Sequence, residues 1–214
     1  RSYYKDDQLY AEELINLYRI TGQKKRYIDE SLLTLSWLPE LRESLQNQFQ
    51  ISFSDKDYDI LEQSLFVYIG KTNATVYQQM LVWLYLQRKD FYEAFVQQRS
   101  IDLKLRQGGA VLLEISNIAA KNKSYEEAEE ILTYVCDKYT EQSIYVMAKR
   151  RLIEIQEIAV NNSFPVDTVK VNSILSQYDV LKQKARSASE RSKIEFSQAK
   201  LYAFQLNDFN KSIE

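Results

Sequence analysis

The sequence contains no histidine, so the commonest general base, metal ligand and proton switch near neutral pH is missing. It has a single cysteine, Cys136, which excludes an internal disulfide and a cysteine-cluster metal site. Glycine and proline are also scarce, at four and two residues among 214. Because tight turns and sheet corners depend on these two residue types, their scarcity favours a mostly helical protein.

Long apolar runs, glycine-rich phosphate loops and a strong net charge are missing as well. The longest apolar run, around residues 81–86, is far shorter than the roughly 18 residues that a membrane span requires. Gly22, Gly70 and the pair at 108–109 do not match the spacing of either phosphate-binding loop. A net charge of −2 gives no general attraction to nucleic acid or anionic lipid. We therefore expect a non-enzymatic chain with no cofactor, no metal and no transmembrane segment.

Two local features allow a chemical interpretation and a structural one. Cys136 would need an activating base or a cationic environment to act as a nucleophile, and we favour a buried or half-buried structural side chain instead. The acidic residues Glu126, Glu127, Glu129 and Glu130 could suggest a site for a hard cation. Carboxylates at the start of a helix also complement the helix dipole and face solvent, and this is the interpretation we favour.

The stretch from Ala110 to Tyr139 contains the clearest pair of helices. Apolar residues recur at three- to four-residue spacing between positions 111 and 119, and again between positions 125 and 135. A polar break separates the two runs, and Ser124 with Glu127 is then typical of a capping box at the start of the second helix. Each such helix pair leaves an apolar face uncovered, so that we expect further pairs to pack against it.

The same periodicity predicts helices along the rest of the chain. Pro39 and Pro165 mark boundaries or first helical turns, and Gly108 with Gly109 forms the clearest turn. The expected helices cover residues 6–20, 27–38, 41–48, 58–70, 75–88, 91–105, 142–160, 169–184 and 188–205, and another begins at Phe209.

Residues 48–54 are ambiguous because polar and apolar side chains alternate there. The alternation permits a strand, but no second strand candidate lies nearby to pair with it. A connector pinned by Phe49, Ile51 and Phe53 explains the pattern more simply. Ser54 and Asp57 then carry the capping signal for the following helix.

A repeat is visible at a period of 34 residues, which separates Phe91 from Tyr125 within similar segments. This period is typical of the tetratricopeptide repeat. The chain therefore resembles tetratricopeptide-repeat proteins, whose helix pairs stack into a right-handed superhelix that binds other proteins. The residues at the family's signature positions are Gln78, Leu81, Val82, Tyr85, Ala94 and Gln98 in one repeat, and Leu112, Ile115, Ser116, Ala119, Ala128 and Leu132 in the next.

The resemblance implies an all-α fold, a right-handed α-solenoid of antiparallel helix pairs. Val82 replaces the family's small residue, Gln98 replaces an aromatic, and the closing proline is absent, so we expect irregular repeats. We predict one repeat domain over residues 1–214, clearest at about 75–140, with an enlarged repeat at about 141–185 and a last repeat truncated at 214. Because the sequence begins at Arg1 without a methionine, we interpret it as a fragment of a longer chain.

The resemblance also implies that the first helix of each pair lines a concave groove. The candidate contact residues in that groove are Gln79, Trp83, Gln87, Asn117 and Lys121, although Trp83 could equally serve in packing between repeats. Only Asn117 and Lys121 fit the clamp by which some family members hold a chaperone's terminal carboxylate, which disfavours a cochaperone. We predict a non-catalytic scaffold that binds a protein or peptide segment. The alternative is a regulatory or sensor module for a catalytic or DNA-binding domain outside these residues.

A run of basic residues raises the question of an acidic or nucleic-acid partner. Glu154, Glu157 and Glu190 are interspersed among these cations, which favours ion pairs on helix surfaces over a nucleic-acid track. The basic residues are Lys149, Arg150, Arg151, Lys182, Lys184, Arg186, Arg191 and Lys193.

The low cysteine count fits either the cytoplasm or an envelope protein without disulfides, and we lean slightly towards a bacterial envelope or periplasm.

Overall fold

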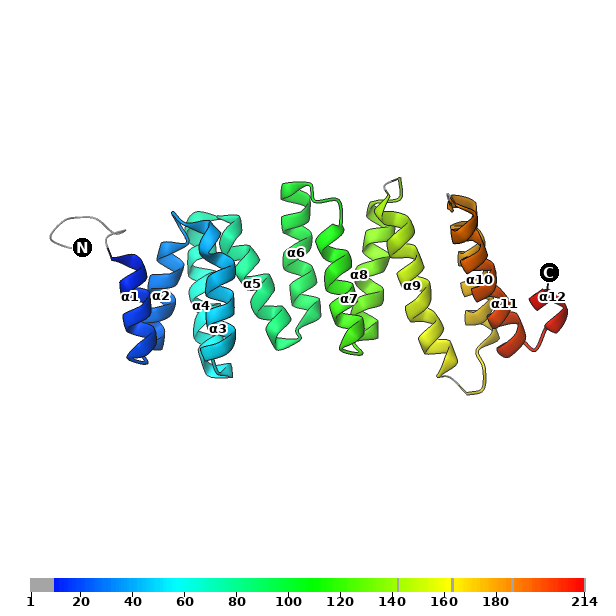
Figure 1. Cartoon of the computed structure of the whole chain (residues 1–214), viewed down its shortest axis with the longest axis horizontal. Coiled ribbons are helices and arrows are strands. Elements are labelled where there is room, and N and C mark those ends of the chain that lie inside the picture. Colours follow the sequence, from blue (N-terminus) through cyan, green and yellow to red (C-terminus); the bar gives the residue numbers. More distant parts are fainter. Residues whose placement is uncertain (1–9, 142, 163, 186, 214) are drawn as a thin grey trace. The chain divides into compact units, whose positions relative to one another are not determined.

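The computed structural model describes residues 10–141, 143–162, 164–185 and 187–213 (Figure 1). Within these ranges the chain forms twelve α-helices and one short 3-10 helix, with no strand. The predicted all-α class is therefore confirmed. The chain divides into two compact units, Arg1–Leu105 and Arg106–Glu214.

The first unit contains six α-helices and the 3-10 helix. Helix α1 packs against α2, α4 packs against both α2 and α5, and α5 packs against α6. Helix α3 packs against the 3-10 helix η1 and against α5. The elements are α1 (Ala11–Ile20), α2 (Lys24–Thr34), η1 (Pro39–Leu41), α3 (Arg42–Ser52), α4 (Asp55–Thr72), α5 (Thr75–Arg88) and α6 (Phe91–Leu105).

The second unit is built from successive helix neighbours. Helix α8 packs against α7 and α9, α10 packs against α9 and α11, and α11 packs against α12. Helix α7 also contacts α9 directly. The elements are α7 (Ala110–Lys121), α8 (Tyr125–Lys138), α9 (Ile144–Asn161), α10 (Thr168–Lys184), α11 (Ala188–Phe204) and α12 (Phe209–Ile213).

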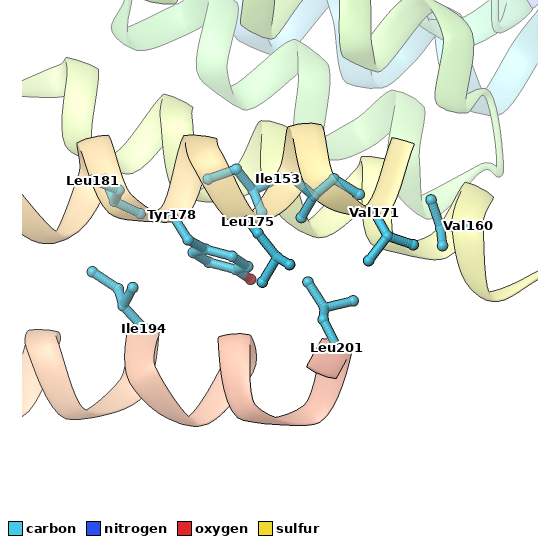
Figure 2. Packing of buried hydrophobic residues seen from close by; sticks show 9 residues of the cluster. Ile153, Val160, Val171, Leu175, Tyr178, Leu181, Ile194 and Leu201 are labelled. Carbon is cyan, nitrogen blue, oxygen red and sulfur yellow. The ribbon is translucent and has the colours of Figure 1, made fainter. Parts of the chain in front are cut away.

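The core of the second unit includes a cluster of buried side chains that α10 shares with its two neighbours. Figure 2 shows Leu175 and Tyr178 of α10 facing Ile194 and Leu201 of α11, while Ile153 of α9 packs from the other side. The three- to four-residue spacing of the apolar positions places them on one stripe of each helix. Burial of this stripe fixes which side chains of α9 and α11 remain on the surface.

Residues 48–52 are helical, so the expected connector is wrong except at Phe53 and Ser54, and the alternative of a strand is wrong as well. Helix α3 continues to Ser52, and the alternation arises because only one helical stripe is buried. Leu45 and Phe49 lie four residues apart on that stripe, whereas Ile51 is 88% exposed on the opposite side. A period of two over a few residues is also compatible with a helix that has one buried position per turn.

The sequence predicted the capping box of α4 correctly and the starts of α8 and α10 only in part. The expected capping box at Ser54 is present, because the Asp57 carboxylate accepts the Ser54 backbone N–H and hydroxyl, each at 2.9 Å. Ser124 precedes α8 but makes no side-chain capping hydrogen bond, so the capping box predicted there is wrong. Pro165 does not begin a helix either, since α10 starts at Thr168 and the Asp167 carboxylate accepts the Lys170 N–H at 3.1 Å.

Candidate functional site

Three of the candidate contact residues lie on α5 in the first unit. Gln79, Trp83 and Gln87 are spaced four residues apart, which places them on one face of the helix, and all three are half-buried. The Gln79 Oε1 atom accepts a hydrogen bond from Arg42 Nη1 at 2.5 Å. This face of α5 is therefore tied to α3 by a polar contact.

Trp83 belongs to an aromatic cluster that joins α2, α3, α4 and α5. Its ring lies 6.0 Å from Tyr58 and 6.4 Å from Phe49, measured between ring centroids. Phe49 stacks on Phe53 at 4.4 Å and meets the edge of Tyr27 at 5.3 Å. Burial raises the pKa of Tyr27 to about 12, and its hydroxyl donates to a glutamine at 3.0 Å. Trp83 thus contributes to packing within the first unit and is only partly available to a partner.

The other two candidate residues lie on α7 in the second unit. Asn117 is half-buried and Lys121, one turn later, is exposed. The Asn117 Oδ1 atom accepts a hydrogen bond from Arg151 Nε of α9 at 3.1 Å. Arg151 also donates from Nη1 to Glu154 Oε2 at 2.7 Å. The predicted contact positions of α7 are therefore continuous with a polar row on α9.

A pocket of about 350 Å³ lies between α9 and α11, and we call it the α9/α11 pocket. Side chains on α9 at four- and three-residue intervals form one wall, and side chains on α11 form the other. The charged and phenolic residues that line the pocket are Arg150, Glu154 and Glu157 from α9, Tyr178 from α10, and Lys193 and Lys200 from α11.

The two acidic side chains of the α9/α11 pocket already have partners. Glu154 accepts from Arg151, and Glu157 accepts the Tyr178 hydroxyl at 2.9 Å. Burial raises the pKa of Glu157, which the Tyr178 hydrogen bond and the nearby Lys200 charge partly oppose. Burial and the Glu157 carboxylate together raise the pKa of the Tyr178 phenol. The Glu157–Tyr178 hydrogen bond is part of the pocket wall.

The two features for which the sequence allowed a chemical interpretation, Cys136 and the acidic cluster, both lie on α8. Cys136 is buried as expected, and this burial raises the pKa of its thiol to about 11. The Glu129 carboxylate of the acidic cluster accepts a hydrogen bond from Gln156 at 2.7 Å. Among the described residues, no group of three or more cysteine and acidic side chains could hold a metal ion. Nor does any described helix combine the length and the apolar character of a membrane span.

The basic residues noted in the sequence have several kinds of surroundings: Arg151 and Lys182 form ion pairs, Arg150 and Lys193 line the pocket, and Lys149 and Lys184 donate to neutral groups. Lys182 pairs with Glu195 at 2.6 Å, and Lys149 donates to Gln177 at 2.6 Å. Arg186 lies outside the described residues. The sequence interpretation did not include Tyr178 or Lys200 in the site. The regular spacing of polar residues 193, 197 and 200 on one face of a helix could have indicated that position 200 belongs to the site.

Comparison with known proteins does not assign the chain to a family. No protein-family model matches the chain, and no curated protein matches it significantly. The resemblance to tetratricopeptide repeats therefore stays a prediction based on the residues named above.

Proposed function

We propose that this chain is a non-catalytic scaffold that binds a segment of a protein partner on a polar face of α7, α9 and α11. The polar face consists of Asn117, Lys121, Arg151 and the α9/α11 pocket. In tetratricopeptide-like terms, these three helices are the first members of successive pairs. We propose a second, separate contact surface within the first unit, namely the face of α5 that carries Gln79, Trp83 and Gln87.

The observation that carries the proposal is the hydrogen-bonded contact between Asn117 and Arg151. It fixes two half-buried polar side chains at the junction of α7 and α9. Arg151 uses Nε and Nη1 in the contacts described above, and a guanidinium has further N–H donors to offer. The Asn117 amide likewise offers its NH₂ group. Side chains that are already positioned lose less conformational entropy on binding, which favours recognition at this face.

The α5 face supplies a different kind of contact. The edge of Trp83 that its aromatic neighbours leave uncovered offers a rigid apolar surface, and glutamines on either side offer amide groups. Aromatic side chains of this kind give contact area at low entropic cost. A partner segment with alternating apolar and polar side chains would be suited to this surface.

The experiment is a selection of binders from a displayed library of random peptides about 12 residues long, with the whole chain as the target. Affinities of the enriched peptides are then measured by fluorescence anisotropy. We expect the Asn117→Ala/Lys121→Ala variant to bind about tenfold more weakly, because each lost polar contact is worth about 0.5–1.5 kcal/mol.

The matched control is Lys170→Ala/Asn172→Ala, which removes the same two side-chain types from exposed positions of α10. This control should bind like the parent chain, and circular dichroism should show the same helix content in all three proteins. If no peptide is enriched, or if both variants bind equally well, the proposed function is wrong.

A further inference from the structure

We propose that the α9/α11 pocket binds the carboxylate of an aspartate or glutamate side chain in the partner segment. This inference rests on the proposed function and assigns one chemical preference to it. The sequence alone favoured a different use of these cations, namely ion pairs on the helix surface.

The charge balance of the pocket supports an anionic ligand. Three cations face two carboxylates across the lining. Each carboxylate is engaged, one by Arg151 and the other by the Tyr178 hydroxyl. Arg150 and Lys193 form no salt bridge within the described ranges of the chain. The pocket therefore has uncompensated positive charge, although the chain as a whole carries a net charge of −2.

The shape and chemistry of the lining favour a single carboxylate. Arg150 is half-buried, and its planar guanidinium can donate to both oxygens of a carboxylate in a geometry that a lysine cannot offer. Ile194 is buried and is the apolar residue of the lining, so it can contact the methylene groups of an aspartate or glutamate. Lys193 is exposed and can move to meet the ligand.

The same lining argues against a nucleic-acid strand. A strand presents a continuous series of phosphates, which requires a matching series of cations. Here Glu154 and Glu157 line the same pocket as Arg150, Lys193 and Lys200, so that a series of phosphates would also meet like charge. A single side-chain carboxylate carries one charge and needs only Arg150 and Lys193, while Glu154 and Glu157 keep their partners Arg151 and Tyr178.

The test is a double-mutant cycle between the pocket and the selected peptides. Each enriched peptide is compared with an analogue in which its acidic residue is replaced by the corresponding amide. The chain variants are Arg150→Gln/Lys193→Gln and the exposed single variant Lys193→Gln. The charge-matched control is Lys56→Gln/Lys138→Gln, at exposed lysines outside the pocket.

We expect the parent chain to bind the acidic peptide about tenfold more tightly than its amide analogue, and the control to keep this preference. The Arg150→Gln/Lys193→Gln variant should bind both peptides equally, and Lys193→Gln should show an intermediate preference. Increasing the salt concentration should reduce the preference of the parent chain.

Two results would overturn the inference while leaving the proposed function intact. The first is a set of enriched peptides whose affinity does not depend on an acidic residue, or depends on it equally in the parent and the pocket variant. The second is tighter binding of single-stranded DNA of about 20 nucleotides, lost in the pocket variant. If no peptide is enriched at all, the proposed function fails and the inference fails with it.

Discussion

Replacing Gly109 with alanine should destabilise the second unit by about 2–5 kcal/mol. Gly109 precedes α7 with a φ of +82°, a left-handed conformation that costs an alanine about 1–2 kcal/mol. The new Cβ atom would also lie 2.8 Å from Tyr139 Cδ2 and 3.3 Å from Val135 Cγ1. The Tyr139 side chain is 7% exposed and has little room to move, so this overpacking adds about 1–3 kcal/mol.

Two other glycines separate the backbone contribution from the packing contribution. Gly22 has a φ of +69°, and a Cβ atom added there would have no neighbour within 4 Å, so Gly22→Ala should show the backbone cost of about 1–2 kcal/mol alone. Gly70 lies inside α4, where an added Cβ atom would likewise have no neighbour within 4 Å. Gly70→Ala should therefore stabilise the chain by about 0.5–1 kcal/mol, because alanine loses less backbone entropy in a helix.

The assay is urea unfolding of the three variants and the parent, followed by far-ultraviolet circular dichroism. The expected order of stability is Gly70→Ala, parent, Gly22→Ala and then Gly109→Ala. If Gly109→Ala lowers the free energy of unfolding by no more than Gly22→Ala does, the aromatic ring of Tyr139 does not pack against this turn in solution. That result would refute the local structure from which the start of α7 is derived.

Three further predictions concern single side chains. Burial raises the pKa of the Cys136 thiol to about 11. Native protein at pH 8 should therefore react with iodoacetamide far more slowly than protein unfolded in urea. Equal reaction rates would contradict the burial of Cys136. The pKa of Glu157 is raised in the folded state, so the parent loses stability as pH rises above the ordinary value of 4.5. Glu157→Gln should therefore gain stability relative to the parent between pH 4 and pH 7 in urea titrations, and a loss over that range would be inconsistent with the burial of the carboxylate. Phe49→Ala should destabilise the chain by about 3–5 kcal/mol in the same titration, since Phe49 is fully buried against Tyr27 and Phe53, and a cost below about 1 kcal/mol would refute the aromatic cluster.

The sequence predicted helices well wherever apolar periodicity and local turn signals agreed. Helices α5 and α6 begin and end at the predicted residues, because Lys89 and Asp90 interrupt an otherwise continuous pattern. Lys89 adopts a left-handed backbone conformation with a φ of 62°, as expected for a residue that ends a helix. Where the signal was only local, as at Ser124, the side chain did not make the expected hydrogen bond.

The candidate site was less predictable, because its composition depends on contacts between helices. Asn117 and Lys121 could be selected from their positions on one helix, but the Arg151 contact comes from a residue 34 positions later. Similarly, Trp83 could be assigned to a surface or to packing, and the rings that surround it come from other helices. Periodicity identifies which face of a helix is polar, whereas tertiary packing decides which polar faces meet.

The most direct test of the account is to map a selected peptide on the chain by amide chemical-shift changes in nuclear magnetic resonance. We expect the largest changes on α7, α9 and α11, at Asn117, Lys121, Arg150, Arg151 and Lys193. Chemical-shift changes confined to α8 and α10 would contradict the proposed site. So would changes of equal size when the peptide lacks its acidic residue and when the chain carries Asn117→Ala/Lys121→Ala.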